Sequence, residues 1–383
     1  MINFKTLAHD TQTVTANLLQ RGYALDHETI LTKQKQINDL KQEIEKINAK
    51  INKQEHTPEG KEQLKKFKQE LIKAEEQYEG IVHLVPNIIH ATVPPGKGAE
   101  DNPVVKVAEI EHLDTGDYIK KGKPLGLDIE AGVDLAGARF TVLRGEVAKL
   151  HRKLINTALD FYTNQGYEEI YVPNLVKKEI VFGTAQYPKF KEEIFTTEMN
   201  EELFLLPTGE VPLTNLVRNK VLKEYEVETK MMTHTPCFRK EVGAAGKDTK
   251  GIVRQHQFEK VELVRTCFPE NGLTNLNEMM DDVENFVKTL NLKYRIIELC
   301  AGDLGFAGHK AYDFELWFAH DKRWREIASI TWCHDFQARR MNTRFKRNGK
   351  PELIHTLNGT GLAAGRVMAA ILENNCVDGK IIF

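Results

Sequence analysis

Two narrow apolar stripes dominate the first quarter of the chain. In both, apolar residues recur at alternating spacings of three and four, with Lys, Gln and Glu between them; the stripes comprise Ile37, Leu40, Ile44, Ile47 and Ile51, then Leu64, Phe67, Leu71, Ala74, Tyr78 and Ile81. The break HTPEG separates them. This pattern predicts an antiparallel two-helix coiled coil over about residues 30–84, roughly 35–40 Å long. The competing interpretation is two helices packed on a globular domain, which usually have a broader apolar face.

The rest of the chain alternates between helix and strand patterns. Residues 145–166 carry a helical stripe that ends at Gly166, a plausible C-cap glycine. EIYVP then reads as a strand that stops at Pro173, and AYDFELWFA alternates strictly between apolar and mostly polar positions. Strict alternation is typical of an antiparallel sheet with one buried face. We therefore expect an α+β protein: a helical arm (1–85), a linker rich in Pro and Gly (86–103), and a domain built on a mainly antiparallel sheet with flanking helices (104–383).

Composition narrows the classes of function. The 383 residues are 41% hydrophobic and 28% charged, with a net charge of −2, which argues against a general nucleic-acid coat but leaves room for local basic surfaces. The predicted arm carries many lysines: Lys33, Lys35, Lys41, Lys46, Lys50, Lys61, Lys65, Lys66 and Lys68. No membrane-length apolar run or targeting presequence is visible, so we expect a cytoplasmic protein with no membrane partner. Five scattered cysteines predict reduced buried thiols and no structural zinc, a zinc site being the competing interpretation.

The stretch FRKEVGAAGKDTKGIVRQHQFEKVELV is the richest in candidate chemistry. It lacks the Walker pattern. If IVRQHQFEKVELV is a strand, its period of two places Arg254, Phe258 and Glu262 on one face, together with His256 and Lys260. Arg239 and Glu241 share a face of the preceding strand. Forked arginines and an aromatic ring suit a nucleotide; the competing interpretation is a solvated hairpin whose charges pair with one another.

Three other stretches carry candidate residues. LLPTGEVPLTN places Thr208 and Glu210 two residues apart, and WREIASITWCHDFQARR places Glu326, a possible magnesium ligand, in a strand. HTLNGTGLAAGRVMAAILEN reads as a strand, a glycine turn and a helix with Arg366 in its first turns, which favours anion binding. Each has a simpler interpretation, as a turn residue, an ion-pair partner or a packing device.

Together these stretches resemble the bacterial-type seryl-tRNA synthetases, a family of class II aminoacyl-tRNA synthetases, over nearly the whole chain. RGEVAKLHRKLINTALDFYTNQGYEEIYVP resembles motif 1, which implies a homodimer interface. The stretch from Phe238 to Val264 resembles motif 2, and GTGLAAGRVMAAILE resembles motif 3. HQFEKVEL and DFQARRMN resemble the seryl branch in particular.

The resemblance implies a role for each matching residue. Arg239, Glu241 and Arg366 would be catalytic. The implied ATP contacts are Arg239, Lys240, Glu241, Arg254, Gln255, Phe258, Glu326, Ile327, Ala328, Ser329 and Arg366. Glu326 and Ser329 would bind Mg²⁺. The implied serine site consists of Thr208, Gly209, Glu210, Glu262, Asn358 and Thr360.

The implied activity is serine–tRNA ligation: activation of L-serine by ATP, then transfer to tRNA(Ser), with tRNA(Sec) as a second candidate acceptor. The chain departs from the family pattern at Gly209, where TGE replaces TAE, and at Ala328 and Trp332, where EIASITWCHDF replaces EISSCSNCxDF. We expect Gly209 to add backbone freedom, and the other two to alter the ATP side of the pocket. The arm is also shorter than is usual for the family. The altered EIASITWCHDF segment and the short arm motivate one alternative, a catalytically inactive tRNA- or protein-binding paralogue. A coiled-coil adaptor is a further alternative.

Overall fold

The computed structural model describes residues 10–52, 58–198, 202–244 and 251–383. The chain divides into two compact units, residues 1–88 and 89–383. The division falls within the stretch predicted as a linker. In the second unit, Ile89 and Val93 from that stretch are buried against Ile297 and Leu299 of the large sheet's edge.

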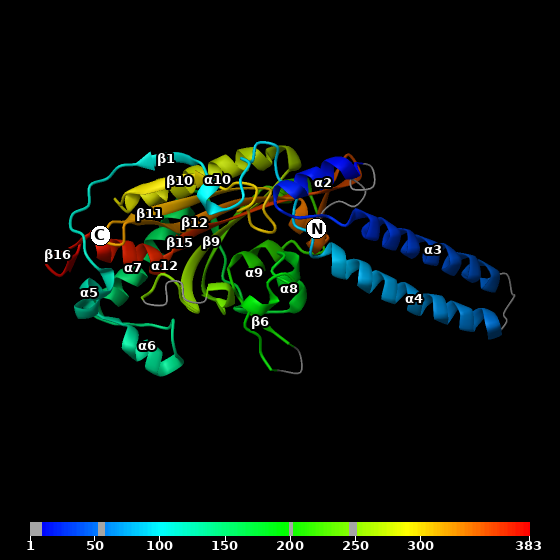
Figure 1. Cartoon of the computed structure of the whole chain (residues 1–383), viewed down its shortest axis with the longest axis horizontal. Helices are drawn as coiled ribbons and strands as arrows, with labels where there is room; N and C mark the ends of the chain where they lie inside the picture. Colours follow the sequence, from blue (N-terminus) through cyan, green and yellow to red (C-terminus); the bar gives the residue numbers. More distant parts are fainter. Residues whose placement is uncertain (1–9, 53–57, 199–201, 245–250) are drawn as a thin grey trace. The chain divides into compact units, whose positions relative to one another are not determined.

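The first unit consists of α2 (Thr11–Gln20), α3 (His27–Asn52) and α4 (Pro58–Val82) (Figure 1). Asp10 caps α2, because its carboxylate accepts a hydrogen bond from the backbone N–H of Thr13 at 3.2 Å. Gly22, with φ of 71°, ends the helix in a left-handed conformation that glycine adopts without steric cost.

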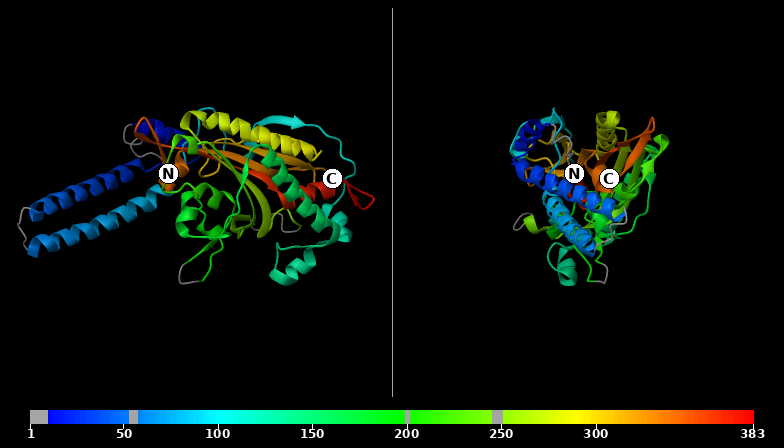
Figure 2. Two further views of the ribbon diagram at one scale, coloured as in Figure 1. Left: turned by 180° about the vertical axis from the view of Figure 1, so that it is seen from behind. Right: turned by 90° about the vertical axis from the view of Figure 1, so that its right-hand side faces the viewer.

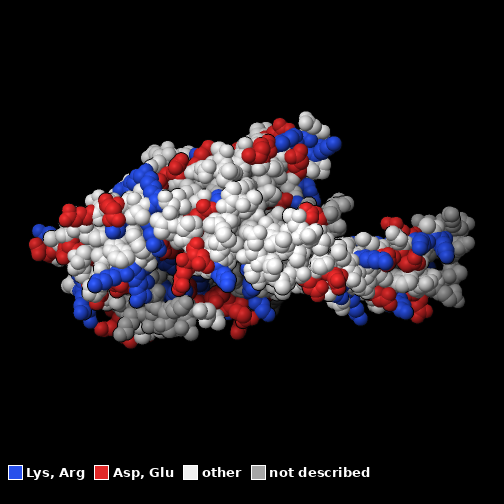
Figure 3. All heavy atoms as spheres, turned by 45° about the horizontal axis from the view of Figure 1, so that its top comes forward, with Lys and Arg blue, Asp and Glu red and all other residues white. Residues whose placement is uncertain are grey.

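Helices α3 and α4 pack along the predicted seam. Ile37, Ile47 and Ala74 are buried, and the other predicted seam residues whose side chains are described are at least half-buried. Ile51 lies outside the described side chains. Lys33 donates to Gln77 at 2.8 Å, and Lys41 pairs with Glu75 at 2.8 Å. Basic and acidic side chains are interspersed along the two helices (Figure 3). The predicted pair of packed helices is therefore confirmed.

The second unit is built on an eight-stranded sheet (Figures 1 and 2). In spatial order its strands are β1 (Val104–Ala108), β10 (Tyr294–Glu298), β11 (Lys310–Phe318), β12 (Arg323–His334), β15 (His355–Ala363), β9 (Gln257–Cys267), β8 (Thr229–Phe238) and β4 (Glu168–Glu169). All neighbours are antiparallel except β4 and β8. The expected mainly antiparallel sheet is confirmed.

Helices and small strands surround this sheet. The helices of this unit are α5 (Tyr118–Gly122), α6 (Ile129–Ala136), α7 (Gly145–Asn164), α8 (Lys178–Gly183), α9 (Glu210–Asn215), α10 (Gly272–Thr289), α11 (Phe336–Met341) and α12 (Ala364–Asn374). The short strands are β2 (Leu127–Asp128), β3 (Val142–Leu143), β5 (Leu175–Val176), β6 (Phe204–Leu205), β7 (Val221–Leu222), β13 (Arg344–Arg347), β14 (Lys350–Leu353), β16 (Cys376–Val377) and β17 (Lys380–Ile381). Among the described helices, none is long and apolar enough to cross a membrane.

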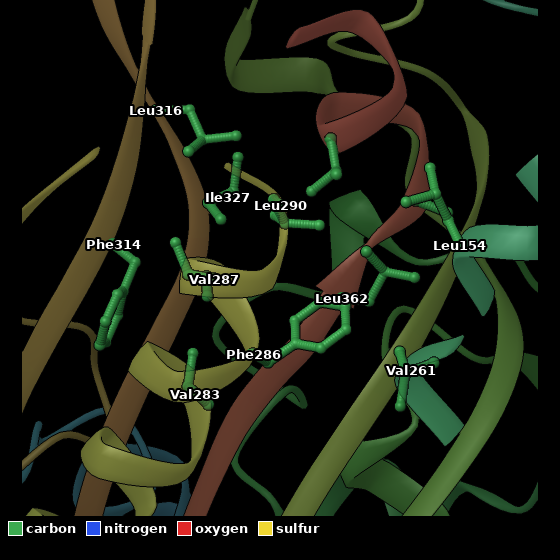
Figure 4. Packing of buried hydrophobic residues seen from close by; sticks show 14 of the residues in the cluster. Leu154, Val261, Val283, Phe286, Val287, Leu290, Phe314, Leu316, Ile327 and Leu362 are labelled. Atoms are coloured by element: carbon green, nitrogen blue, oxygen red, sulfur yellow. The ribbon is translucent and has the colours of Figure 1, made fainter. Parts of the chain in front are cut away.

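Helices α7, α10 and α12 cover one face of the sheet and bury its main core. Phe286 of α10 and Leu290, which directly follows this helix, lie among Phe314, Ile327 and Leu362 from the strands β11, β12 and β15 (Figure 4). The predicted alternation in β11 is confirmed, because Phe314, Leu316 and Phe318 are fully buried and the intervening residues are not. The opposite face of the central strands is left for polar side chains.

A buried arginine ties the sheet to α10. Arg265 of β9 is fully buried, and it pairs with Asp282 at 2.6 Å and with Glu278 at 2.7 Å. Its Nε donates to the hydroxyl of Tyr167 at 2.9 Å, and that hydroxyl donates to Asp282 at 3.0 Å. This network compensates the charge of an arginine in the apolar layer.

The end of α7 confirms one local prediction and corrects another. Gly166 has φ of 84°, and the N–H groups of Gly166 and Tyr167 return to the carbonyls of Thr163 and Tyr162, as in a Schellman motif. The predicted strand to Pro173 is wrong for the most part, since β4 ends at Glu169.

Candidate active site

The polar face of the sheet holds a pocket with an empty volume of about 630 Å³, here called the arginine pocket. Its lining residues come from β9, β12 and β15, the start of α12, and the segments between β8 and β9. Its lining residues are Arg239, Glu241, Ile252, Val253, Arg254, Gln255, Phe258, Lys260, Glu326, Ile327, Thr360, Ala363, Gly365 and Arg366. Three arginines and an aromatic ring from segments far apart in sequence therefore meet in one cavity.

The strand geometry predicted for this region is partly wrong. Strand β9 begins at Gln257 and not at Ile252, so Arg254 lies in the irregular segment before it. Strand β8 ends at Phe238, and Glu241 follows with φ of 52°, a left-handed conformation. Of the residues predicted to share this face, only Phe258 and Lys260 lie on β9 and line the pocket.

Irregular backbone nevertheless brings the predicted charges together. Arg254 pairs with Glu241 at 2.5 Å. The Arg239 guanidinium lies 5.3 Å from the centre of the Phe258 ring, and its Nε donates to the carbonyl of Pro207 at 3.1 Å. Because these groups are half-buried and mutually oriented, they form a fixed set of forked donors for anionic oxygens. They do not form a solvated hairpin surface.

Motif 3 is a strand that runs directly into a helix. The predicted glycine turn is wrong: β15 continues through Gly359 and Gly361 to Ala363, and α12 begins at Ala364. Arg366 does lie in the first turn of α12. Its guanidinium donates to the carbonyls of Val253 and Glu326, at 3.2 and 2.7 Å.

A β-bulge in β12 decides which way Glu326 faces. In the β11–β12 register, Phe314 lies opposite Ala328 and Glu315 lies opposite Glu326, so Ile327 is an extra residue. Residues three apart on a regular strand face opposite sides. Because the extra residue shifts the alternation of side chains by one position, Glu326 and Ser329 lie on the same face of the sheet.

An acidic group adjoins these two residues. Ser329 lies opposite Asp313 in the register, and its hydroxyl hydrogen-bonds to the Asp313 carboxylate. Burial, and then the charge of Glu326, raise the pKa of Asp313 well above its ordinary value. One Asp313 oxygen, Oδ1, is buried with no hydrogen-bond partner among the described residues.

Hard oxygen donors of this kind fit a magnesium ion. No group of three or more His, Cys, Asp or Glu side chains among the described residues has the geometry to hold a metal by itself. Mg²⁺ commonly takes only one or two carboxylates and completes its shell with phosphates and water. The residues present are compatible with that mode.

A buried polar network lies beside the arginine pocket. Lys260 pairs with Glu262 and donates to the Thr208 hydroxyl at 2.8 Å, while Thr208 donates to Glu262 at 2.9 Å. All three residues are buried. Glu262 also lies between Thr233 of β8 and Thr360 of β15 in the sheet register. The arrangement presents charges and hydroxyls suited to a small polar molecule.

Glu210 is held in a separate buried contact. Gln337 of α11 donates to its carboxylate at 2.6 Å, and Gln337 accepts a hydrogen bond from Thr356 at 2.7 Å. Burial, and then the neighbouring charge of Glu262, raise the pKa of Glu210 to about 7. A carboxyl that titrates near neutrality is typical of functional sites.

Gly209 plays a different part from the one expected. Its φ and ψ of −63° and −18° are ordinary helical values, so the position needs no glycine freedom. A Cβ at this position would lie 2.6 Å from the methyl group of Thr233 and 3.0 Å from Cβ of Glu262. Gly209 thus makes room for Thr233 beside the network.

A second cavity, with an empty volume of about 510 Å³, is here called the Phe190 pocket. It is lined by Thr184, Ala185, Gln186, Phe190, Glu210, Gly305, Phe306, Ala307, Gly308, Thr331, Cys333 and Asn358. The Cys333 thiol lies 3.6 Å from the Asn358 side-chain oxygen. Asn358 lines this pocket and Thr360 lines the arginine pocket, so the candidate serine residues stand where the two cavities adjoin.

Two predicted site residues, and one residue expected only to affect the shape of the pocket, lie elsewhere. Lys240 extends towards the Phe195 ring, at 5.7 Å. Ala328 belongs to the main hydrophobic core, opposite Phe314, and does not line the arginine pocket. Trp332 also points away from that pocket, into an aromatic cluster with His309 at 4.7 Å. The expectation that Ala328 and Trp332 reshape the ATP side is therefore wrong.

Two polar residues of the site, Lys260 and Gln337, could not be assigned a role from the sequence. Lys260 was expected on the right face but without a role, and Gln337 lay inside DFQARRMN without one. Both are single polar residues whose importance depends on tertiary contacts with Thr208 and Glu210. Residues 245–250, which include most of the glycine-rich loop, lie outside the described residues.

Comparisons with known proteins agree with this geometry. Residues 189–375 match the model of the tRNA synthetase class II core domain (G, H, P, S and T). The chain is 39% identical to a serine–tRNA ligase of Methylobacillus flagellatus and 40% identical to one of Chromobacterium violaceum, each over all of this chain and 96% of the relative. The chain belongs to the seryl-tRNA synthetase family.

Solved seryl-tRNA synthetase structures share the fold. The Pyrococcus horikoshii enzyme, described as complexed with ATP, matches with a TM-score of 0.87 and 30% identity, over all of this chain and 96% of that one. The Naegleria fowleri serine–tRNA ligase in complex with AMP matches with a TM-score of 0.84 and 27% identity, over 95% of this chain and 90% of that one. The chain therefore shares the fold of these two structures over at least 90% of their lengths.

Proposed function

We propose that this seryl-tRNA synthetase family member is an ATP-dependent serine–tRNA ligase. The observation that carries the proposal is the arginine pocket, with its three guanidinium groups, next to the buried Thr208–Lys260–Glu262 network. Full-length identity of about 40% to serine–tRNA ligases supports the same activity.

In the first step, a serine carboxylate oxygen attacks the α-phosphorus of ATP, and the bond to the β-phosphate oxygen breaks to release pyrophosphate. Arg239 holds the α-phosphate, with Glu241 orienting Arg254. Arg254 and Arg366 hold the distal phosphates, and the Phe258 ring lies against adenine. Catalysis comes from positioning and from neutralising phosphate charge, because no protein nucleophile is needed.

Magnesium, when bound, supplies further neutralisation of the phosphates, with Glu326 and Ser329 as its protein ligands. The bulge at Ile327 supports this assignment because it aligns the two side chains. Neighbouring Asp313 hydrogen-bonds to Ser329 and so helps to orient its hydroxyl.

Serine recognition runs through the buried groups. Glu210 in its ionised form pairs with the serine ammonium, and Glu262, Thr208, Thr360 and Asn358 surround the hydroxyl and backbone atoms. A site whose polar groups are built to pair a hydroxyl rejects alanine, because those groups would be left unpaired.

In the second step, tRNA accepts the serine. The proposed assembly is a homodimer working in the cytoplasm, where thiols stay reduced. All five cysteines lie in the described residues, where they are buried and form no disulfide. The edge strand β1 supports an interface between copies, because Val104, Val105 and Val107 are exposed on it.

Serine-dependent exchange of pyrophosphate into ATP tests the proposal. We expect exchange with serine, much less with threonine or alanine, and its loss in Arg239→Ala with the fold retained. Absence of exchange with serine, or near-normal turnover in Arg239→Ala, would contradict the proposed activity.

A further inference from the structure

A buried ammonium group lies within the candidate serine site. Lys260 of β9 is 6% exposed, and its Nζ pairs with Glu262 and donates to the Thr208 hydroxyl at 2.8 Å. Lysine is almost never buried unless it is paired. The roles proposed for Thr208 and Glu262 in serine binding leave none for Lys260, although its side chain also lines the arginine pocket.

The hydrogen bonds of this network leave one acceptor open. The Thr208 hydroxyl accepts from Lys260 and from the backbone N–H of Glu210, at 2.8 and 3.2 Å, and donates to Oε2 of Glu262 at 2.9 Å. These three bonds use the whole capacity of a hydroxyl. Because Oε2 also pairs with Lys260, while Oε1 of Glu262 accepts no hydrogen bond from the described residues, Oε1 is the oxygen open to a substrate group.

The charges of the site leave room for one further cation. Lys260 compensates Glu262, so Glu210 is the carboxyl left for the ammonium group of an amino acid. The groups act on one another, because burial and then Glu262 raise the pKa of Glu210, whereas Gln337 and then Lys260 lower it. The site therefore suits a substrate with one ammonium group near Glu210 and a neutral donor near Glu262.

A second ammonium group beside Glu262 would be unfavourable. It would lie next to the Lys260 ammonium, and like charges repel strongly where water is excluded. A hydroxyl can donate to Oε1 of Glu262 without that repulsion. Removing the charge of Lys260 would reverse this preference, because the buried carboxylate of Glu262 would then lack its cation.

We propose that Lys260 determines specificity, by making the serine site accept a hydroxyl and reject an ammonium group on the β-carbon of the amino acid. Lys260 is a positioning residue in this role, because it acts through the charge and orientation of Glu262. The inference rests on the proposed ligase function and deepens it. Its test substrate is L-2,3-diaminopropionate, which differs from serine by an ammonium group in place of the hydroxyl.

Pyrophosphate exchange with serine and with L-2,3-diaminopropionate tests the inference through the ratio of the two kcat/KM values. Lys260→Met removes the charge and keeps the length of the side chain, and Lys260→Gln removes the charge but can still donate to Glu262. The double variant Lys260→Met/Glu262→Gln also removes the carboxylate that would be left without a cation. Thermal unfolding checks that each variant is folded.

Lys310→Met is the matched control. Lys310 of β11 is 4% exposed, pairs with Glu298 and donates to the Thr92 hydroxyl at 3.0 Å, so it forms the same kind of buried network. Lys310 does not line the arginine pocket. This variant therefore shows what the loss of a buried lysine does to exchange when the serine site is left intact.

We expect the unaltered protein to favour serine over L-2,3-diaminopropionate by about 100-fold or more. In Lys260→Met and Lys260→Gln, kcat/KM for serine should fall and the ratio should shift towards diaminopropionate by at least about tenfold. The double variant should lose this shift, because no uncompensated carboxylate remains. Lys310→Met should leave the ratio unchanged.

Equal losses with both substrates in the two Lys260 variants would overturn the inference, since Lys260 would then act on the fold or on groups that both substrates share. A shift that persists in the double variant would also overturn it, because the shift would not come from Glu262. Absence of serine exchange by the unaltered protein would instead contradict the ligase function.

Discussion

The side-chain amide nitrogen of Gln337 lies 2.6 Å from a carboxylate oxygen of Glu210. The orientation of the amide is set from behind, because Thr356 donates to its oxygen. Gln337 therefore presents only N–H to Glu210, and it favours the ionised carboxylate against the opposing effects of burial and Glu262. Gln337 therefore influences the ionisation of Glu210, the carboxyl that we propose as the partner of the serine ammonium.

Serine activation should rise with pH through neutrality. Glu210 has a pKa raised to about 7 and must be ionised to pair with an ammonium. The pH profile of kcat/KM for serine, measured by pyrophosphate exchange, should therefore show an acidic limb near pH 7. Gln337→Leu should move this limb to higher pH, and Thr356→Val should do so less. A profile that is flat from pH 6 to 8 would exclude this role for Glu210.

The same carboxyl should lower stability at alkaline pH. Its folded pKa of about 7 is above the ordinary 4.5, so the native state holds the proton more tightly. Its contribution to stability is full below pH 4.5 and is lost as pH rises through 7. Glu210→Gln should therefore be the more stable protein at pH 8, by on the order of 2–3 kcal/mol, and equal near pH 4.5, while losing exchange activity. Urea unfolding at the two pH values measures this, and equal differences at both would refute it.

Gly209→Ala should be harmful for steric reasons. The new methyl group would meet the Thr233 methyl at 2.6 Å. We expect a loss of about 1–3 kcal/mol of stability and a raised KM for serine. Thr233→Ser removes the opposing methyl, so the double variant should recover most of both losses. A double variant no better than Gly209→Ala would show that the clash is not with Thr233.

Removing the buried arginine should destabilise the fold without altering substrate contacts. Arg265→Leu leaves Asp282 buried and uncompensated, at a cost of about 3–5 kcal/mol. Adding Asp282→Asn should recover part of this loss. The free energy of urea unfolding measures both changes, and a single variant as stable as the parent would contradict the importance of this network.

Exposed lysines of α4 should affect tRNA and leave adenylate formation unchanged. Replacing Lys65, Lys66 and Lys68 together by Gln should raise the KM for tRNA about tenfold and weaken its salt dependence. The matched control replaces Lys33, Lys41 and Lys46, which already contact Gln77, Glu75 and Glu43. Equal effects of the two triple variants on charging would indicate general charge loss, and unimpaired charging would exclude a role for the α4 lysines.

Periodic features were predictable from the sequence. The apolar seam of α3 and α4 and the alternation in β11 both follow from the regular spacing of apolar residues. This spacing arises because one side of each element is buried and the other faces solvent. Phe258, Lys260 and Glu262 share a face for the same reason. In each case a single element determines which side chains are buried, so no knowledge of its neighbours was needed.

The remainder depended on irregular backbone or on tertiary contacts. Arg254 lies before β9, and Glu241 has a left-handed backbone conformation after the end of β8. The two residues were therefore predicted correctly to lie together, but not because both belong to regular strands. The roles of Gly209 and Gln337 exist only through Thr233 and Thr356. Propensity and periodicity carry no information about such pairings between distant segments.

The extra residue Ile327 matters for any attempt to redesign β12 as a regular strand. Straightening β12 with Ile327 retained in the ladder would shift the alternation by one position and turn the Glu326 side chain into the apolar layer beneath α10. The strand would gain hydrogen bonds and bury a carboxylate. An irregularity that looks like a defect of the sheet therefore keeps a carboxylate on the polar face, and it limits how far β12 can be regularised in a redesigned scaffold.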